Sequence, residues 1–121
     1  MTRRSCSKRD SEQIQMILKY CNDIEYFLEL HGSDENSLDE ISVQYDFVFP
    51  LMQIGEHVKR LSFELREEHK EVDWKGMAGM RDIIVHRYMA IDVTIVRATI
   101  LNDVPLLKDA CTSILKDLSV P

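Results

Sequence analysis

Apolar residues recur along much of the chain at intervals of three and four positions, the spacing that places side chains on one face of an α-helix. Such spacing predicts a core-facing helix from near Ser42 to His69. Pro50 lies inside this stretch and lacks the amide that would bond back to Asp46, so we expect either a kink or a helix start just before Pro50. The regular run comprises Phe47, Leu51, Ile54, Val58, Leu61 and Leu65.

An earlier helix is predicted from Asp10, which is followed three positions later by Gln13 in the pattern of an N-cap with its capping-box partner. Gly32 is well placed to end this helix, and residues 33–40 are expected to form an acidic loop or turn. One buried face is expected, made of Ile14, Ile17, Leu18, Cys21, Ile24 and Leu28.

A third helix is predicted from Trp74 to about Arg87, with Asp73 as its N-cap. Its inner face is expected to carry Met77, Met80 and Ile84. Gly76 and Gly79 each weaken such a helix by about 1 kcal/mol relative to alanine, so tertiary packing must hold it together.

The remaining residues predict a fourth helix capped by Asp92 and a last helix, separated by a break at Asn102, Asp103 and Pro105. No segment shows the sustained period-two alternation of a strand. The expected fold is therefore all-α, an up-and-down bundle of four to five helices. Because 121 residues is close to the usual size of one domain, residues 1–9 are predicted to be a flexible basic arm and residues 10–121 a single domain.

The composition is that of a folded globular protein, with 45% hydrophobic and 30% charged residues. No apolar run approaches the roughly 18 to 20 residues that a membrane-spanning helix needs, and the basic start has no apolar stretch behind it. Cys6, Cys21 and Cys111 lack the paired spacing of a disulfide framework or zinc site, and we assign them no chemistry. A cytoplasmic location without membrane contact is expected.

The net charge of −6 argues against a nucleic-acid partner, but the charges are unevenly distributed. Residues 22–46 include eight acidic residues and no Lys or Arg, and should repel RNA. Residues 75–97 include four basic and two acidic residues, a balance of +2. Any site for phosphate is therefore expected within residues 75–97.

Within that stretch, eight consecutive positions combine a fixed cation, a carboxylate, an imidazole and a phenol: Arg81, Asp82, His86 and Tyr88. The imidazole can move a proton at a ribose hydroxyl or a leaving oxygen, and the guanidinium can stabilise charge on phosphorus. Asp82, four positions before His86, could orient the imidazole. A solvated helix end with one ordinary ion pair is the alternative, and residue chemistry alone leaves both open. No pattern for a metal or cofactor site appears.

The other three histidines are not predicted to take part in catalysis. His31 and His69 lie at expected helix ends among charged neighbours and are interpreted as solvated surface residues. His57 lies beside the core stripe and is interpreted as a structural residue, with a supporting role near the site as the alternative.

The spacing of Arg81 and His86 adds a geometric constraint. Five residues at about 100° each place these side chains roughly 140° apart on a continuous helix, too far to share one phosphate easily. Either the helix unwinds near Val85, or two copies of the chain bring duplicate side chains together around a two-fold axis. Tyr88, seven residues after Arg81, returns to nearly the same direction.

Arg81, four intervening residues, His86, one residue and Tyr88 together resemble the R-x4-6-H motif of HEPN domains, in the R-x4-H-x-Y form of the HepT-like toxins. The similarity extends to residues 74–80 before the motif, to Ile91 and Asp92 after it, and to residues 54–62, and covers about residues 10–118. The resemblance implies a HEPN-type helical bundle that forms a homodimer, with the motif in a cleft between protomers.

The resemblance further implies a toxin of a toxin–antitoxin system that cleaves RNA as a metal-independent endoribonuclease. Arg81 would be the phosphate and transition-state ligand, and His86 the general acid or base. A cognate minimal nucleotidyltransferase antitoxin would transfer AMP to Tyr88. Asp82 stands where the family often has asparagine, which weakens the positive potential of the site. The alternative function is a non-catalytic helical binding module that partners a nucleotidyltransferase.

Overall fold

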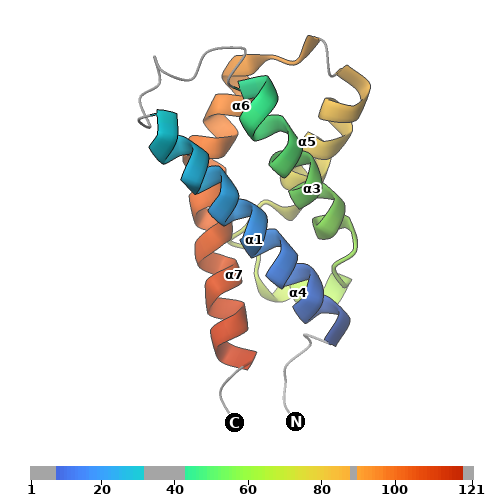
Figure 1. The fold of residues 1–121 in the computed structure, drawn as a ribbon. Coiled ribbons are helices and arrows are strands. Elements are labelled where there is room, and N and C mark those ends of the chain that lie inside the picture. The colour runs from blue at the N-terminus through green and yellow to red at the C-terminus, as the bar shows by residue number, and fades with distance from the viewer. Residues whose placement is uncertain (1–7, 32–42, 88–89, 119–121) are drawn as a thin grey trace.

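The computed structural model describes residues 8–31, 43–87 and 90–118, which form helices joined by short connections (Figure 1). No strand occurs within these ranges, which confirms the predicted all-α class. The expected helix end at Gly32 and the loop at residues 33–40 lie outside the described residues. The helical elements are α1 (Lys8–His31), η2 (Val43–Phe47), α3 (Val48–Lys59), α4 (Phe63–Glu68), α5 (Trp74–Arg87), α6 (Val93–Ala98), η4 (Thr99–Asp103) and α7 (Val104–Leu118).

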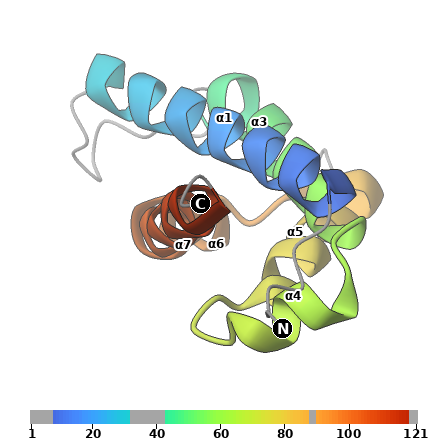
Figure 2. The ribbon, with the colours of Figure 1, turned by 90° about the horizontal axis from the view of Figure 1, so that it is seen from below.

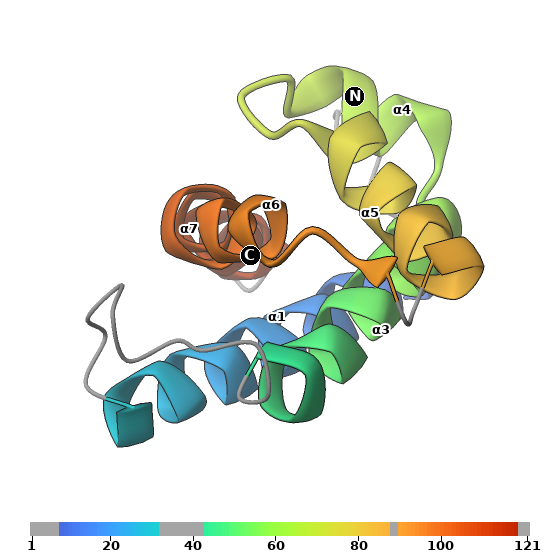
Figure 3. The ribbon, with the colours of Figure 1, turned by 90° about the horizontal axis from the view of Figure 1, so that it is seen from above.

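The helices are arranged in two layers, which Figures 2 and 3 show from opposite ends. Helices α1 and α3 pack side by side in one layer. On the other side of this layer, α6 and α7 lie at one edge, where α7 packs against α1, while α5 packs against α3 at the other edge with α4 beside it. Helix α5 therefore lies at one edge of the bundle.

The core consists largely of the faces that the hydrophobic spacing predicted. All six residues of the regular run from Phe47 to Leu65 are buried. The predicted face of α1 is also confirmed, with Ile14, Ile17, Cys21 and Ile24 fully buried and Leu18 and Leu28 packed against the core. Apolar side chains from α3, α5 and α7 complete the same cluster.

The prediction of one helix from near Ser42 to His69 is wrong, because this stretch is divided into three elements, whereas the expected alternative of a helix start just before Pro50 is confirmed. A π-helical turn, η2, leads into α3, which begins two residues before Pro50. The chain then leaves the helix after Lys59, and the hydroxyl of Ser62 accepts a hydrogen bond from the Leu65 amide at 3.1 Å, which starts α4. The apolar spacing continues across this break, so the hydrophobic pattern does not reveal it.

The predicted capping box at Asp10 is also wrong. Helix α1 begins at Lys8, and Asp10 is only 2% exposed within it. Its carboxylate accepts hydrogen bonds from the Ser62 amide at 2.9 Å and the Ser62 hydroxyl at 2.6 Å. Gln13 bonds instead to Nδ1 of His57, 2.6 Å away on α3. Both residues therefore connect α1 to the next two helices.

The caps predicted in the second half of the chain are confirmed. Asp73 accepts a hydrogen bond from the Gly76 amide, and Asp92 accepts one from the Thr94 amide, both at 2.9 Å. The expected break near Asn102 is instead a second π-helical turn, η4, which joins α6 directly to α7. Among the described residues no helix is both long enough and apolar enough to cross a membrane.

Candidate active site

Arg81, Asp82 and His86 all lie on α5, which is continuous through Arg87. The helix therefore does not unwind near Val85, and the first of the two geometric alternatives is wrong. Arg81 and His86 project in directions roughly 140° apart. Arg81 is partly buried in the middle of the helix, whereas His86 is exposed in its last turn. Tyr88 lies outside the described residues.

The position of Arg81 depends on a close approach between α3 and α5 at Gly55. A β-carbon placed on Gly55 would lie 2.3 Å from Cβ of Arg81 and 3.0 Å from the carbonyl oxygen of Met77. Real β-carbons do not approach side-chain carbons so closely, so only glycine fits at this crossing. The contact brings the residue after Gly55 within reach of the Arg81 guanidinium.

Two carboxylates hold the Arg81 guanidinium. Its Nε lies 2.7 Å from Oε2 of Glu56 on α3, and its Nη1 donates a hydrogen bond of 3.1 Å to Oδ1 of Asp82. The hydrogen bond to Asp82 and the charge of Glu56 raise the pKa of Arg81. Since an arginine is charged at any physiological pH, the effect of these contacts is to fix the position of the cation and reduce its net potential.

Asp82 connects Arg81 to a further cation. Its Oδ1 also accepts a hydrogen bond of 2.5 Å from Nζ of Lys59 on α3. The bonds to Lys59 and then to Arg81 lower the pKa of Asp82, which therefore remains ionised. The expected contact between Asp82 and His86 is not formed within the described part of the chain, where Lys59 and Arg81 are the partners of this carboxylate. Asp82 therefore pairs with Lys59 on α3 and not, as expected, with His86 on its own helix.

Sequence reasoning missed three residues of this network, namely Gly55, Glu56 and Lys59. Gly55 and Glu56 were noted only as part of the family resemblance, and Lys59 gave no signal. Their importance comes from the crossing of two helices about 25 positions apart in the sequence. A glycine followed by an acidic residue on a core-facing helix was the one available sign of a close crossing that carries an ion pair.

The remaining histidines do not join this network. His57 is held by Gln13 and stacks on the ring of Tyr20, and burial lowers its pKa, which favours the structural interpretation. His31 was expected to be solvated, and that expectation is wrong. Its Nε2 lies 2.5 Å from Oδ2 of Asp46, and its ring packs on Phe47. His31 thus links the end of α1 to η2.

The described residues contain no cluster of three or more His, Cys, Asp or Glu side chains that could hold a metal ion. Cys21 and Cys111 are buried free thiols in the core. Burial raises the pKa of Cys21 to about 12, so its reactive thiolate form is suppressed. Both cysteines are structural here.

A helical bundle that carries an arginine and a histidine five residues apart on one helix agrees with the HEPN class of proteins that the motif indicated. The family model described as "Ribonuclease HepT-like" matches residues 17–114, and the chain belongs to this HepT-like family. No solved structure matches the chain.

Named relatives agree with this assignment. A "Putative RNase" of Caldanaerobacter subterraneus subsp. tengcongensis is 44% identical over 70 residues, which cover 58% of this chain and 62% of the relative. A "Putative RNase" of Methanocaldococcus jannaschii is 32% identical over 102 residues, 84% of each chain. The "Probable ribonuclease HepT" of Thermococcus cleftensis is 30% identical over 98 residues, covering 81% of this chain and 82% of the relative.

Proposed function

We propose that this protein is the toxin of a toxin–antitoxin pair, an endoribonuclease that cleaves RNA without a metal ion at a cleft between two copies of the chain. The observation that carries the proposal is that the Arg81 and His86 motif of the HepT-like family lies on a continuous helix, with the guanidinium fixed by neighbouring carboxylates and the imidazole exposed. The names of the relatives support an RNA-cleaving activity.

The reaction needs only these side chains and the ribose itself. His86, as a base, removes the proton from a 2′-hydroxyl, whose oxygen attacks the adjacent phosphorus. The bond to the 5′-oxygen breaks, and an imidazolium returns a proton to that leaving oxygen. The products are a 2′,3′-cyclic phosphate and a 5′-hydroxyl. The Arg81 guanidinium stabilises the charge that develops on the non-bridging oxygens.

A second copy of the chain would allow an Arg81 and a His86 side chain to meet at one phosphate. On a continuous α5 the Arg81 and His86 side chains diverge, but a two-fold axis can place His86 of one copy near Arg81 of the other. Exposed apolar residues lie within the motif and on the helix that follows it, namely Ile83 and Val85 on α5 and Ile95 on α6. Ile83 and Ile95 line an apolar hollow of about 350 Å³ between these helices. This surface is suited to burial against a second copy.

The nuclease is tested with purified protein, free of any partner, incubated with RNA in excess EDTA. We expect cleavage with cyclic-phosphate or 3′-phosphate ends, lost in Arg81→Ala and in His86→Ala. The matched control is His69→Ala, a histidine on the connection between α4 and α5. Complete dependence on added metal would refute the mechanism.

The shared cleft is tested by mixing the two inactive variants after partial unfolding and refolding. A heterodimer of Arg81→Ala and His86→Ala retains one site with both side chains, so about a quarter of the wild-type activity should return. No recovery, or an active strict monomer at micromolar concentration, would contradict a composite site.

We further propose that a cognate nucleotidyltransferase attaches AMP to the phenolic oxygen of Tyr88. The position of Tyr88 seven residues after Arg81 supports this. One added negative charge about 4 Å from a substrate phosphate opposes it by roughly 4 kcal/mol at an effective dielectric near 20, an upper value that salt reduces. RNA binding could thus fall by up to about a thousandfold.

Mass spectrometry after co-expression with the nucleotidyltransferase and ATP tests the modification. One or more AMP units should appear on wild type and on Tyr26→Phe, which removes an exposed tyrosine of α1, but not on Tyr88→Phe. If the catalytic activity of the partner still fully neutralises the Tyr88→Phe variant, the modification that inactivates the toxin lies on another residue.

One observation favours a second candidate, a non-catalytic module that binds a nucleotidyltransferase. Glu56 and Asp82 offset the charge of Arg81, and the chain as a whole carries a charge of −6. Growth arrest separates the two functions. Toxicity that is equal in wild type, Arg81→Ala and His86→Ala, or absent from all three, would favour the module.

A further inference from the structure

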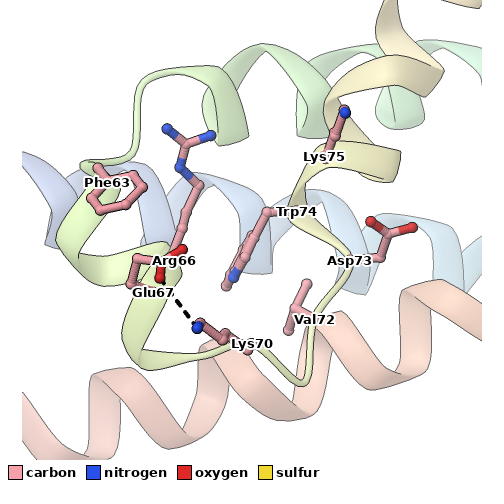
Figure 4. Close-up of a pocket in the computed structure, with 8 residues that line it drawn as sticks. All are labelled: Phe63, Arg66, Glu67, Lys70, Val72, Asp73, Trp74 and Lys75. Carbon is pink, nitrogen blue, oxygen red and sulfur yellow. Dashed lines mark ion pairs between the residues drawn. The ribbon is translucent and has the colours of Figure 1, made fainter.

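A hollow of about 310 Å³ lies between α4, residues 69–73 and the first turn of α5, away from the ion-pair network of Arg81 (Figure 4). Its lining combines basic and aromatic side chains. In Figure 4 the Arg66 side chain extends from α4 with Phe63 on one side and Trp74 on the other. Lys75 lies beyond them at the start of α5.

The acidic residues of this hollow already have partners. Glu67 forms an ion pair with Lys70 at 3.3 Å, and Asp73 accepts the Gly76 amide as the cap of α5. Within the described residues, the side chains of Arg66 and Lys75 have no such partner. Nε of Arg66 is buried and lacks a hydrogen-bond acceptor. This Nε is closed off from the hollow, so the stem of the guanidinium is held by packing, while the Nη groups of Arg66 are not buried and can donate hydrogen bonds to an anionic oxygen in the hollow.

The aromatic residues provide a flat surface next to these cations. The ring of Phe63 is 67% exposed although it is the first residue of a helix that packs on the core. Trp74 is buried, and its Nε1 donates a hydrogen bond of 2.8 Å to the carbonyl of His69, which fixes the indole in the lining of the hollow. An exposed ring beside a guanidinium and an ammonium is suited to a nucleobase and its phosphate.

The hollow is connected to His86 along one face of α5. Lys75, Gly79, Asp82 and His86 follow each other at intervals of four, three and four residues, within about 30° of a common direction. Lys75 and His86 are separated by about 16 Å along the helix axis. A β-carbon on Gly79 would meet no atom within 4 Å, so this face is open at its centre, and Lys59 offsets the charge of Asp82.

We infer that this hollow binds one nucleotide of a single-stranded RNA, with its base against Phe63 and its phosphate at Arg66 and Lys75, while the strand continues along this face of α5 to His86. The inference rests on the proposed function for the identity of the strand. It extends that function by assigning a substrate contact outside the Arg81 and His86 motif. A free mononucleotide carries the same base and phosphate, so the experiment compares both sources.

Trp74 is the only tryptophan of the chain and lines the hollow, so its fluorescence reports occupancy directly. The His86→Ala variant, in which cleavage is blocked, is titrated with AMP and with a single-stranded oligoadenylate of about 12 nucleotides. The oligonucleotide should change the Trp74 fluorescence at a concentration at least about tenfold below that of AMP, because it makes several phosphate contacts.

Variants then assign the contacts. Lys75→Ala and Arg66→Gln should each weaken oligonucleotide binding by about tenfold, and Phe63→Ala by at least about fivefold. Lys19→Ala, which removes one exposed cation from α1, is the matched control and should leave the affinity unchanged. Lys75 and Phe63 are exposed, so these two variants keep the test valid if Arg66→Gln does not fold.

Each outcome separates this inference from the nuclease proposal. Oligonucleotide binding that is unaffected by Lys75→Ala and Phe63→Ala would overturn the site, even if wild type cleaves RNA. AMP binding as tight as that of the oligonucleotide would overturn the path along α5. Binding that depends on these residues in a protein whose wild type cleaves no RNA would support the site and refute the nuclease.

Discussion

Gly55 on α3 lies so close to Arg81 on α5 that a β-carbon at position 55 would be 2.3 Å from that of the arginine. This contact sets the distance between the two helices at the motif. It also allows Glu56 to reach Nε of Arg81 at 2.7 Å. The direction of the guanidinium therefore depends on a residue that has no side chain.

Two glycines of the bundle should respond in opposite ways to alanine. Gly55→Ala should lower the free energy of unfolding by about 1 to 3 kcal/mol, because the methyl group overpacks the crossing, and should reduce RNA cleavage by displacing Arg81. Gly79→Ala should raise the free energy of unfolding by up to about 1 kcal/mol, because the new methyl group meets open space and alanine favours the helix. Urea denaturation measures both changes, and two variants of equal stability would contradict the close crossing.

Asp82→Asn should strengthen RNA binding. The substitution removes a negative charge that lies 3.1 Å from Arg81 and 2.5 Å from Lys59, so the potential at the motif becomes more positive. Because the group is exposed, we expect at most about a fivefold gain at low salt, which should fade as salt is added. Binding is measured in the His86→Ala background. Asp109→Asn on the exposed side of α7 changes the net charge equally, and an equal gain there would rule out a local effect.

Asp10→Ala should destabilise the protein by about 2 to 3 kcal/mol, because it removes a buried carboxylate that accepts two hydrogen bonds from Ser62 and leaves the Ser62 amide without its partner. Glu12→Ala, at an exposed position of α1 two residues after Asp10, is the control and should change stability by less than about 0.5 kcal/mol. Chemical denaturation compares the two. A cost no larger than that of the control would restore the cap interpretation of Asp10.

The stability of the protein should decrease in mild acid partly through His57. Its folded-state pKa lies below the ordinary value of 6.5, chiefly because of burial and then because of Arg60. The unfolded chain therefore binds the proton more readily, and this contribution to stability is present above pH 6.5 and lost as the pH falls through the folded-state pKa. His57→Gln should show a smaller decrease in unfolding free energy between about pH 7 and 5. An identical decrease in both proteins would contradict this assignment.

The sequence by itself determined that the fold is helical, which faces enter the core and where α5 and α6 are capped. These features depend on contacts within four positions of each other, and so they leave a regular pattern in the chain. The caps at Asp73 and Asp92 and the buried faces of α1 and α3 are of this kind. The linear spacing of Arg81 and His86, and the family that it indicates, also belong here.

Only the tertiary structure decided how the side chains of the candidate site are paired. Asp82 could pair with His86 along α5 or with Lys59 across to α3, and the helix crossing selected Lys59. The same crossing brings Glu56 to Arg81. The close approach of α1 to the start of α4 makes Asp10, which was expected to cap a helix, a buried hydrogen-bond acceptor. These partners are tens of positions apart, and their meeting depends on the distance and angle between packed helices, which local spacing does not encode.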